Sequence, residues 1–127
     1  MLSDFERRLE GAVEGFFART FRSGLQPIEL AKALQRYMED NRHVVPDGVV
    51  VPNVFRFRLN PRDVERLSTF GDSLKRELSE VVVRTAAEKH WSLRGRAVVR
   101  LETEPTVPYG TYQLAGMVEQ VQGEPTG

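Results

Sequence analysis

Hydrophobic and polar residues in the middle of the chain first follow a period of two. Between residues 54 and 59, the apolar side chains Phe55, Phe57 and Leu59 alternate with two arginines. A period of two places alternate side chains on opposite faces of a strand, so one face of this segment can be buried while the other meets water. The pattern predicts a β-strand over residues 54–59.

The period then changes to that of a helix. Asn60 and Pro61 have the residue types preferred at an N-cap and at the first helical position, which indicates that a helix begins there. Gly71 interrupts this helix, and a longer one is predicted over residues 72–90, where apolar or small residues recur three or four apart. They are Leu74, Leu78, Val81, Val82, Thr85 and Ala86.

Two further segments with a period of two follow the long helix. Val99 and Leu101 lie on one face of a strand predicted over residues 96–103, and Leu114 marks another strand over residues 111–118. Two prolines and a glycine separate them, so we expect the last strand to close a hairpin with the one before it. The strands at 54–59 and 96–103 form a right-handed crossover unit if they are parallel neighbours.

Two helices are predicted before the first of these strands. Ser3 and Glu6 form a capping box that opens an amphipathic helix ending near residues 23–24, and Pro27 opens a second one that ends at residues 40–41. We expect this helix pair to be antiparallel and to lie beside the sheet. The intervening residues 42–53 are rich in turn formers and leave room for one edge strand around 49–51.

Together these elements predict an α+β fold. It is a two-layer α/β sandwich in which a small mixed sheet of three or four strands is packed by one long helix, with a helix pair at the amino-terminal end. A single domain is expected over residues 1–120, with residues 121–127 as the start of a flexible linker, since they are rich in glycine and lack apolar periodicity. The predicted core includes Phe55, Phe57, Leu74, Leu78, Val82, Val99, Leu101 and Leu114.

The overall charge argues against a polyanionic partner. Eighteen basic residues balance eighteen acidic ones, so no net field would draw the chain to nucleic acid or to an anionic membrane. The sequence has no cysteine and no apolar run long enough to span a membrane, from which we expect a cytoplasmic protein without membrane insertion.

The sequence offers no recognisable catalytic set. His43 and His90 stand in no metal-ligand spacing, and no nucleophile elbow, phosphate-binding loop or dinucleotide motif occurs. His90 fits better as a cation at the end of the long helix, where it faces exposed carbonyls. We therefore expect no enzyme activity, no cofactor and no bound metal.

A basic surface is the alternative hypothesis. Arg56 and Arg58, together with Arg94 and Arg96, could gather near one sheet edge, and the order of elements resembles KH-like nucleic-acid-binding modules. The G-x-x-G loop that clamps nucleotides in such modules is missing, however, and the net charge is zero. A solvated polar strand face is the simpler interpretation, and nucleic acid is not expected as the partner.

Three blocks of sequence together resemble a known family. They are residues 17–21 with 26–31, residues 51–59 and residues 90–101, which carry P-x-E-L, V-P-N and W-x-L-x-G elements in this order. The set resembles the amino-terminal domain of the actinobacterial FhaA proteins, over about residues 3 to 118. In that family the domain precedes a long linker and a carboxy-terminal forkhead-associated (FHA) domain that binds phosphothreonine. Beyond the expected start of the linker at residues 121–127, neither is present in this sequence.

The resemblance implies a non-enzymatic regulatory or interaction domain. It implies a role in signalling that controls cell-wall (peptidoglycan) synthesis and growth, with membrane Ser/Thr kinases and cell-wall synthesis proteins as partners. It assigns this domain no activity of its own and does not give its oligomeric state.

If the chain is a kinase substrate, we expect the acceptor to lie between the last two strands. Thr106, and Thr103 beside it, are the candidate phosphoacceptors, because a kinase must draw its substrate into an extended form and a segment with two prolines forfeits few backbone hydrogen bonds. Thr85 is a poorer candidate because it lies on the apolar face of the predicted long helix. The alternative is that Thr106 is only a polar turn residue.

Overall fold

The computed structural model describes residues 24–120, and their elements follow the periods of the sequence. In chain order they are α2 (Pro27–Asp40), β1 (His43–Val45), β2 (Gly48–Val50), β3 (Val54–Leu59), α3 (Pro61–Leu67), the short 3-10 helix η1 (Ser68–Phe70), α4 (Asp72–Lys89), β4 (Val98–Thr103) and β5 (Tyr112–Met117). The amino-terminal helix predicted to end near residue 23 and the linker at 121–127 lie outside the described residues.

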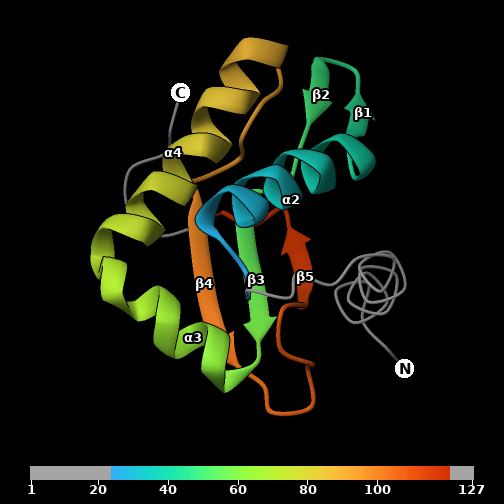
Figure 1. Ribbon diagram of the computed structural model, residues 1–127. Coiled ribbons are helices and arrows are strands. Elements are labelled where there is room, and N and C mark those ends of the chain that lie inside the picture. The colour runs from blue at the N-terminus through green and yellow to red at the C-terminus, as the bar shows by residue number, and fades with distance from the viewer. Residues whose placement is uncertain (1–23, 121–127) are drawn as a thin grey trace.

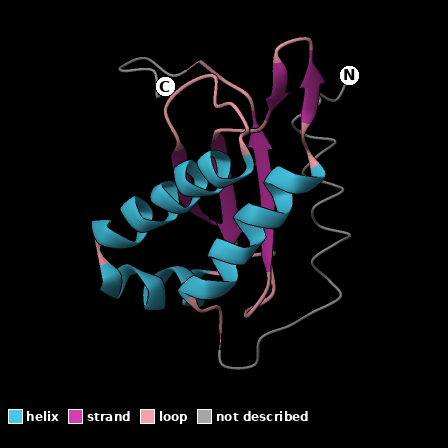
Figure 2. Ribbon diagram, turned by 90° about the horizontal axis from the view of Figure 1, so that it is seen from above, coloured by secondary structure: helices cyan, strands magenta, loops and turns pink. Residues whose placement is uncertain are grey.

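A three-stranded mixed sheet forms one layer of the domain. Its order is β4-β3-β5, with β4 parallel and β5 antiparallel to the central strand β3. Helices α2, α3 and α4 lie on one side of this sheet, as Figures 1 and 2 show. The predicted α+β, two-layer arrangement is confirmed, including the parallel pairing of the strands that flank the long helix.

The expected hairpin between the last two strands is wrong. β5 pairs with β3 and not with β4, so residues 104–111 cross below the end of β3 (Figure 1). Such a loop can span roughly 25 Å, whereas strands on either side of a third are only roughly 10 Å apart. Burial favours β3 as the centre, because Val54, Phe55, Phe57 and Leu59 are all at most 7% exposed.

The segment before β3 contains two short strands, whereas the sequence predicted one. One edge strand was predicted at 49–51, but β1 and β2 form a separate antiparallel hairpin with Val44 opposite Val49. This hairpin joins the rest of the chain by a parallel bridge from Val50 to Ser92. β1 was missed because a three-residue strand is too short to show a period.

Local chemistry fixes both ends of α2. Pro27 is at the start of the helix, and the Glu29 carboxylate accepts the backbone N–H of Gln26 at 3.1 Å. At the other end, the side chain of Asn41 donates to the Tyr37 carbonyl at 2.9 Å. These contacts satisfy backbone groups that a helix leaves unpaired at its ends.

The starts of α3 and α4 also fit their residue types, whereas His90 ends α4 in a left-handed conformation, with a φ of 60°, that few residues other than glycine adopt. Asn60 caps α3 by accepting the N–H of Arg62 at 2.9 Å. Gly71, with a φ of 63°, separates α3 and η1 from α4, and glycine adopts this left-handed conformation without steric cost. His90, expected as a cationic helix end, is the C-cap of α4, and its backbone N–H bonds the carbonyls of Ala86 and Ala87.

The core lies between the helices and the sheet. Seven of the eight predicted core residues are buried, and Leu101 is half-buried. Gly116 lets α2 approach the sheet closely, because a Cβ there would come within 2.8 Å of the Tyr37 ring and 3.0 Å of Phe55. Tyr37 packs edge-on against Phe55 with ring centroids 6.0 Å apart.

Replacing Leu78 by alanine should lower the free energy of unfolding by about 2 to 5 kcal/mol, the range for truncating a buried leucine. Leu78 is 2% exposed on the face of α4 that meets the core, whereas Val83 on the same helix is 40% exposed. Urea denaturation of Leu78→Ala and of the control Val83→Ala measures the difference. Equal midpoints for the two variants would mean that the buried face of α4 is wrongly assigned.

Candidate functional site

Thr106, the first candidate acceptor, lies in the loop of residues 104–111 and is exposed. Its hydroxyl donates a hydrogen bond to the Glu104 carboxylate at 2.9 Å, and its backbone N–H lies 3.3 Å from the same oxygen. The side chain is therefore reached easily from solvent and is held by one local partner.

These two hydrogen bonds lower the pKa of the Glu104 carboxyl group. The hydroxyl of Thr106 lowers the pKa of Glu104 below its ordinary value, the backbone N–H of Thr106 adds to the effect, and the positive charge of Arg58 contributes a smaller part. Both donors bind the ionised form better than the neutral one. Glu104 is thus held as a carboxylate directly beside the candidate acceptor.

The loop is anchored on either side of Thr106. At its start, the N–H of Glu104 donates to the carbonyl of Leu59 at 2.7 Å. After Thr106, Val107 is fully buried and its carbonyl accepts from the Asn60 side chain at 2.9 Å. Pro105 and Thr106 lie exposed between these two fixed points.

Asp63 provides the third anchor, and it joins distant parts of the chain. Its side chain is completely buried, with Oδ2 accepting the N–H of Gly110 at 2.7 Å and Oδ1 accepting the N–H of Leu25 at 2.9 Å. Arg66 lies 3.4 Å from Oδ1 and also donates to the Leu25 carbonyl at 3.2 Å. One carboxylate therefore fixes the entrance to α2, the first turn of α3 and the end of the loop.

From the sequence alone, Asp63 is recognisable only as an acid in the first turn of a helix that Asn60 caps, and its role in holding the loop is not apparent. An acid three residues after an N-cap asparagine is common and carries no sign of burial. The arginine one turn later, Arg66, was the available hint, because an acid with a partner at this spacing can enter the interior as a pair.

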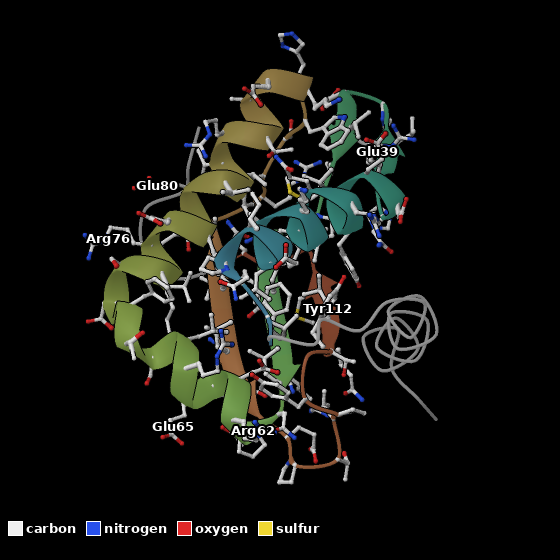
Figure 3. All side chains as sticks on the ribbon, in the orientation of Figure 1. Glu39, Arg62, Glu65, Arg76, Glu80 and Tyr112 are labelled. Atoms are coloured by element: carbon white, nitrogen blue, oxygen red, sulfur yellow. The ribbon has the colours of Figure 1, made fainter. Side chains whose placement is uncertain are left out.

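Arg62 and Tyr109 make a further contact at the loop. The guanidinium of Arg62 lies 4.1 Å from the centre of the Tyr109 ring, a cation–π geometry. Figure 3 shows Arg62 at the lower end of α3, beside the β4–β5 loop.

Thr103, the second candidate, is the last residue of β4, in agreement with the strand predicted over residues 96–103, and does not belong to the loop. It is exposed, yet its backbone belongs to the strand paired with Leu59. Drawing Thr103 into an extended substrate would require the end of β4 to open, so the structure favours Thr106 of the two.

The predicted basic surface is only partly assembled. Arg56 and Arg58 share the sheet face away from the helices, but Glu102 lies between them, 3.7 Å from Arg56 and 3.8 Å from Arg58. A carboxylate at this place offsets much of the positive charge that a phosphate would meet.

Arg94 and Arg96 are not part of this cluster. Both are exposed in the segment before β4, outside the strand ladder. The buried side chain of Asn53 donates to the backbone carbonyl of Arg96 at 2.9 Å. The same side-chain amide donates to the carbonyl of Glu119 at 2.7 Å and accepts the N–H of Glu119 at 2.8 Å. The segment is thus positioned by a structural asparagine.

No catalytic arrangement is apparent among residues 24–120. In that range no three or more acidic or histidine side chains gather as a metal site, and both histidines are exposed. A polar hollow of about 330 Å³ opens between α2 and α4 beside Trp91, whose ring Arg42 covers at 5.9 Å. Within the described residues, no helix combines the length and apolar character needed to cross a membrane.

Comparison with known proteins agrees with this architecture. A solved structure described as "Rv0020c_Nter structure" superposes with a TM-score of 0.68 over 75% of this chain and 73% of that chain, at 22% sequence identity. At this identity the similarity establishes the fold alone, a small α+β domain.

The sequence comparisons establish the family. The model of the FhaA N-terminal domain matches residues 2–115, so the chain belongs to the FhaA N-terminal domain family. A relative, the FHA domain-containing protein FhaA of Mycobacterium tuberculosis, is 26% identical over 114 residues, which cover 89% of this chain. The chain spans only 22% of the length of that relative.

Replacing Asp63 by asparagine should destabilise the domain by about 2 to 4 kcal/mol, because the amide cannot accept both N–H groups without turning its own NH₂ toward one of them. Glu65→Gln is the matched control, since this substitution removes one negative charge from the same helix. The side chain of Glu65 is exposed and points into solvent (Figure 3). Urea denaturation compares the two. A loss of stability as large in Glu65→Gln would show that net charge, and not the buried bonds of Asp63, is responsible.

Proposed function

We propose that this domain is a non-enzymatic regulatory domain of an FHA-domain protein, switched by a membrane Ser/Thr kinase that phosphorylates Thr106. The observation that carries the proposal is the construction of the loop. Its acceptor is exposed, while Asn60 and Asp63 hold the backbone after it.

This construction suits a kinase substrate. The backbone around Pro105 and Thr106 can enter an active site in an extended form without breaking the β-ladders, because β4 ends at Thr103 and β5 begins at Tyr112. Within the loop, the hydroxyl of Thr106 has to give up only its bond to Glu104. Extending this segment also breaks the bond from the Thr106 N–H to the Glu104 side chain and the turn bond from the Val107 N–H to the Glu104 carbonyl. All of these bonds are local, so the acceptor is released without disturbing the anchors of the loop at Asn60 and Asp63.

Phosphorylation would change the charge of this loop sharply. The phosphate adds nearly two negative charges and removes the hydroxyl donor that now stabilises the Glu104 carboxylate. The pKa of Glu104 would rise, and the phosphate and the carboxylate would repel each other. Since Val107 and Gly110 stay anchored, the repulsion would turn the exposed part of the loop outward, where a basic partner site can bind it.

The family supports the wider role. A relative of this chain is an FHA domain-containing protein, and FHA domains bind phosphorylated motifs. We infer that this domain serves in kinase signalling that controls cell-wall (peptidoglycan) synthesis and growth, on the cytoplasmic side of the membrane. Its partners would be a membrane Ser/Thr kinase and cell-wall synthesis proteins.

The alternative of a KH-like nucleic-acid module is less well supported. Glu102 divides the arginines that would form its phosphate track, and Arg94 and Arg96 lie apart from them. We therefore retain the regulatory role as the single proposal.

Incubating the domain with a membrane Ser/Thr kinase from an actinobacterium should place one phosphate on Thr106, because this threonine is exposed outside regular structure. Peptide mass spectrometry locates the phosphate. Thr106→Val should lose at least about 80% of the incorporation, whereas Thr103→Val should retain most of it, as expected if a strand-end threonine is a poor substrate.

Two results would remove the loop from consideration. One is phosphate found only at Thr126, beyond the described residues, and the other is unchanged incorporation in Thr106→Val. Circular dichroism of both variants shows whether they keep the fold, so that a lost signal is not mistaken for unfolding.

A further inference from the structure

Among residues 24–120, β4 is an edge strand of the three-stranded sheet. It pairs on one side with β3, and the described residues place no strand on its other side. The N–H of Val98 donates to Asn53 and that of Glu104 to Leu59, so in this parallel register the even-numbered residues of β4 bond to β3. The backbone groups of Val99, Leu101 and Thr103 therefore point to the outer edge, where they could bond another strand.

An apolar hollow lies beside this edge. It measures about 280 Å³, and its apolar lining comes from Val64 and Leu67 of α3, Leu74 of α4 and Leu101 of β4. The other residues that line it are Ser68, Gly71, Asp72 and Lys75. Figure 1 shows α3 running from the lower end of β3 and β4 toward the side away from β3, where the first half of α4 lies. Helices and edge together thus border a space into which a side chain from an added strand would point.

The opposite face of the edge carries an exposed positive charge. Arg100 lies in the middle of β4 and is exposed, and its side chain points to the sheet face away from the helices, as those of Arg56 and Glu102 do. Among the described residues, Glu102 forms ion pairs with Arg56 and Arg58, and no carboxylate pairs with Arg100. An acidic side chain on an added strand would lie next to this arginine.

We propose that the outer edge of β4 binds an extended acidic and apolar peptide segment of a partner protein, which adds to the sheet as a fourth strand. Its apolar side chains enter the hollow formed with Leu67, Leu74 and Leu101, and the acidic side chains between them lie beside Arg100. Backbone bonds to the edge supply affinity, and the alternation of side chains supplies selectivity. This proposal is independent of phosphorylation at Thr106.

A single strand fits this place better than a second copy of the domain. Two β4 edges paired about a two-fold axis perpendicular to the sheet would put the helices of both copies on the same face. Because α3 and the first half of α4 extend beyond β4 in each copy (Figure 1), the two sets of helices would compete for the same space. A peptide strand lies about 4.8 Å from β4 and carries no such layer.

The probe for the test is a synthetic peptide in which glutamate alternates with leucine and valine over seven residues. Its control has the same side chains but is N-methylated at every residue, which removes the donors needed for strand pairing. At saturating peptide, amide hydrogen exchange followed by NMR should slow at least about tenfold at Val99, Leu101 and Thr103. The already bonded amides of Arg100 and Glu102 should change little, and the methylated peptide should have no effect.

Two charge reversals test the selectivity. Arg100→Glu should lower the affinity of the domain for the acidic peptide by about threefold to tenfold. This is the size expected when one exposed charge pair changes from attraction to repulsion. Arg84→Glu is the control, because it makes the same change of charge at an exposed position of α4. Arg84 lies nine residues, or roughly 13 Å along the helix, from Lys75 at the hollow, so this variant should bind the peptide almost as well as the parent.

Three outcomes would overturn the proposal. The first is binding without slower exchange at Val99, Leu101 and Thr103. The second is equal weakening by Arg84→Glu, which would trace the affinity to net charge alone. The third is a dimer in sedimentation with the same three amides already protected in the free protein, which would show that a second copy occupies the edge.

Discussion

The burial of one carboxylate constrains how this domain is assembled. Asp63 is completely buried, and a carboxylate without partners costs several kcal/mol in such a place. Its partners are the N–H groups of Leu25 and Gly110 and the guanidinium of Arg66. Because these groups come from before α2, from the β4–β5 loop and from α3, the three segments must meet at one point. The sheet and the helix layer are joined there by polar bonds in addition to the apolar core.

The proposed functions use the parts of the structure that these constraints leave accessible. The loop is fixed at Val107 and Gly110, so a modification at Thr106 would act on a short exposed segment and not on the fold. Within residues 24–120, the outer edge of β4 is likewise left without a strand, because β3 occupies only its other side. The two proposed sites are adjacent in the chain, because β4 ends at Thr103 and the loop that carries Thr106 begins at Glu104. A partner at the strand edge and a partner at the phosphorylated loop would therefore lie next to each other.

Periodicity predicted most of the fold because the spacing of apolar residues along a short segment shows which face of a strand or helix is buried. Phe55, Phe57 and Leu78 were placed in the core on that basis, and all three are buried. The partner of β5 could not be obtained in this way, since an alternating pattern shows which face is buried but not which strand lies alongside. The bonds of Asp63 to residues 38 and 47 positions away were equally beyond a local pattern. Thr106 was chosen as a candidate because of the prolines beside it and stays a prediction, and its hydrogen bond to Glu104 was not foreseen.

The central role of Asp63 is tested most directly by native-state hydrogen exchange at two amides. As urea is raised below the unfolding transition, the amides of Leu25 and Gly110 should lose protection together, because both donate to the same carboxylate. If Gly110 exchanged at the rate of an unbonded amide while Leu25 remained protected, the carboxylate would not hold the loop. The account of the loop as an anchored acceptor segment would then be contradicted.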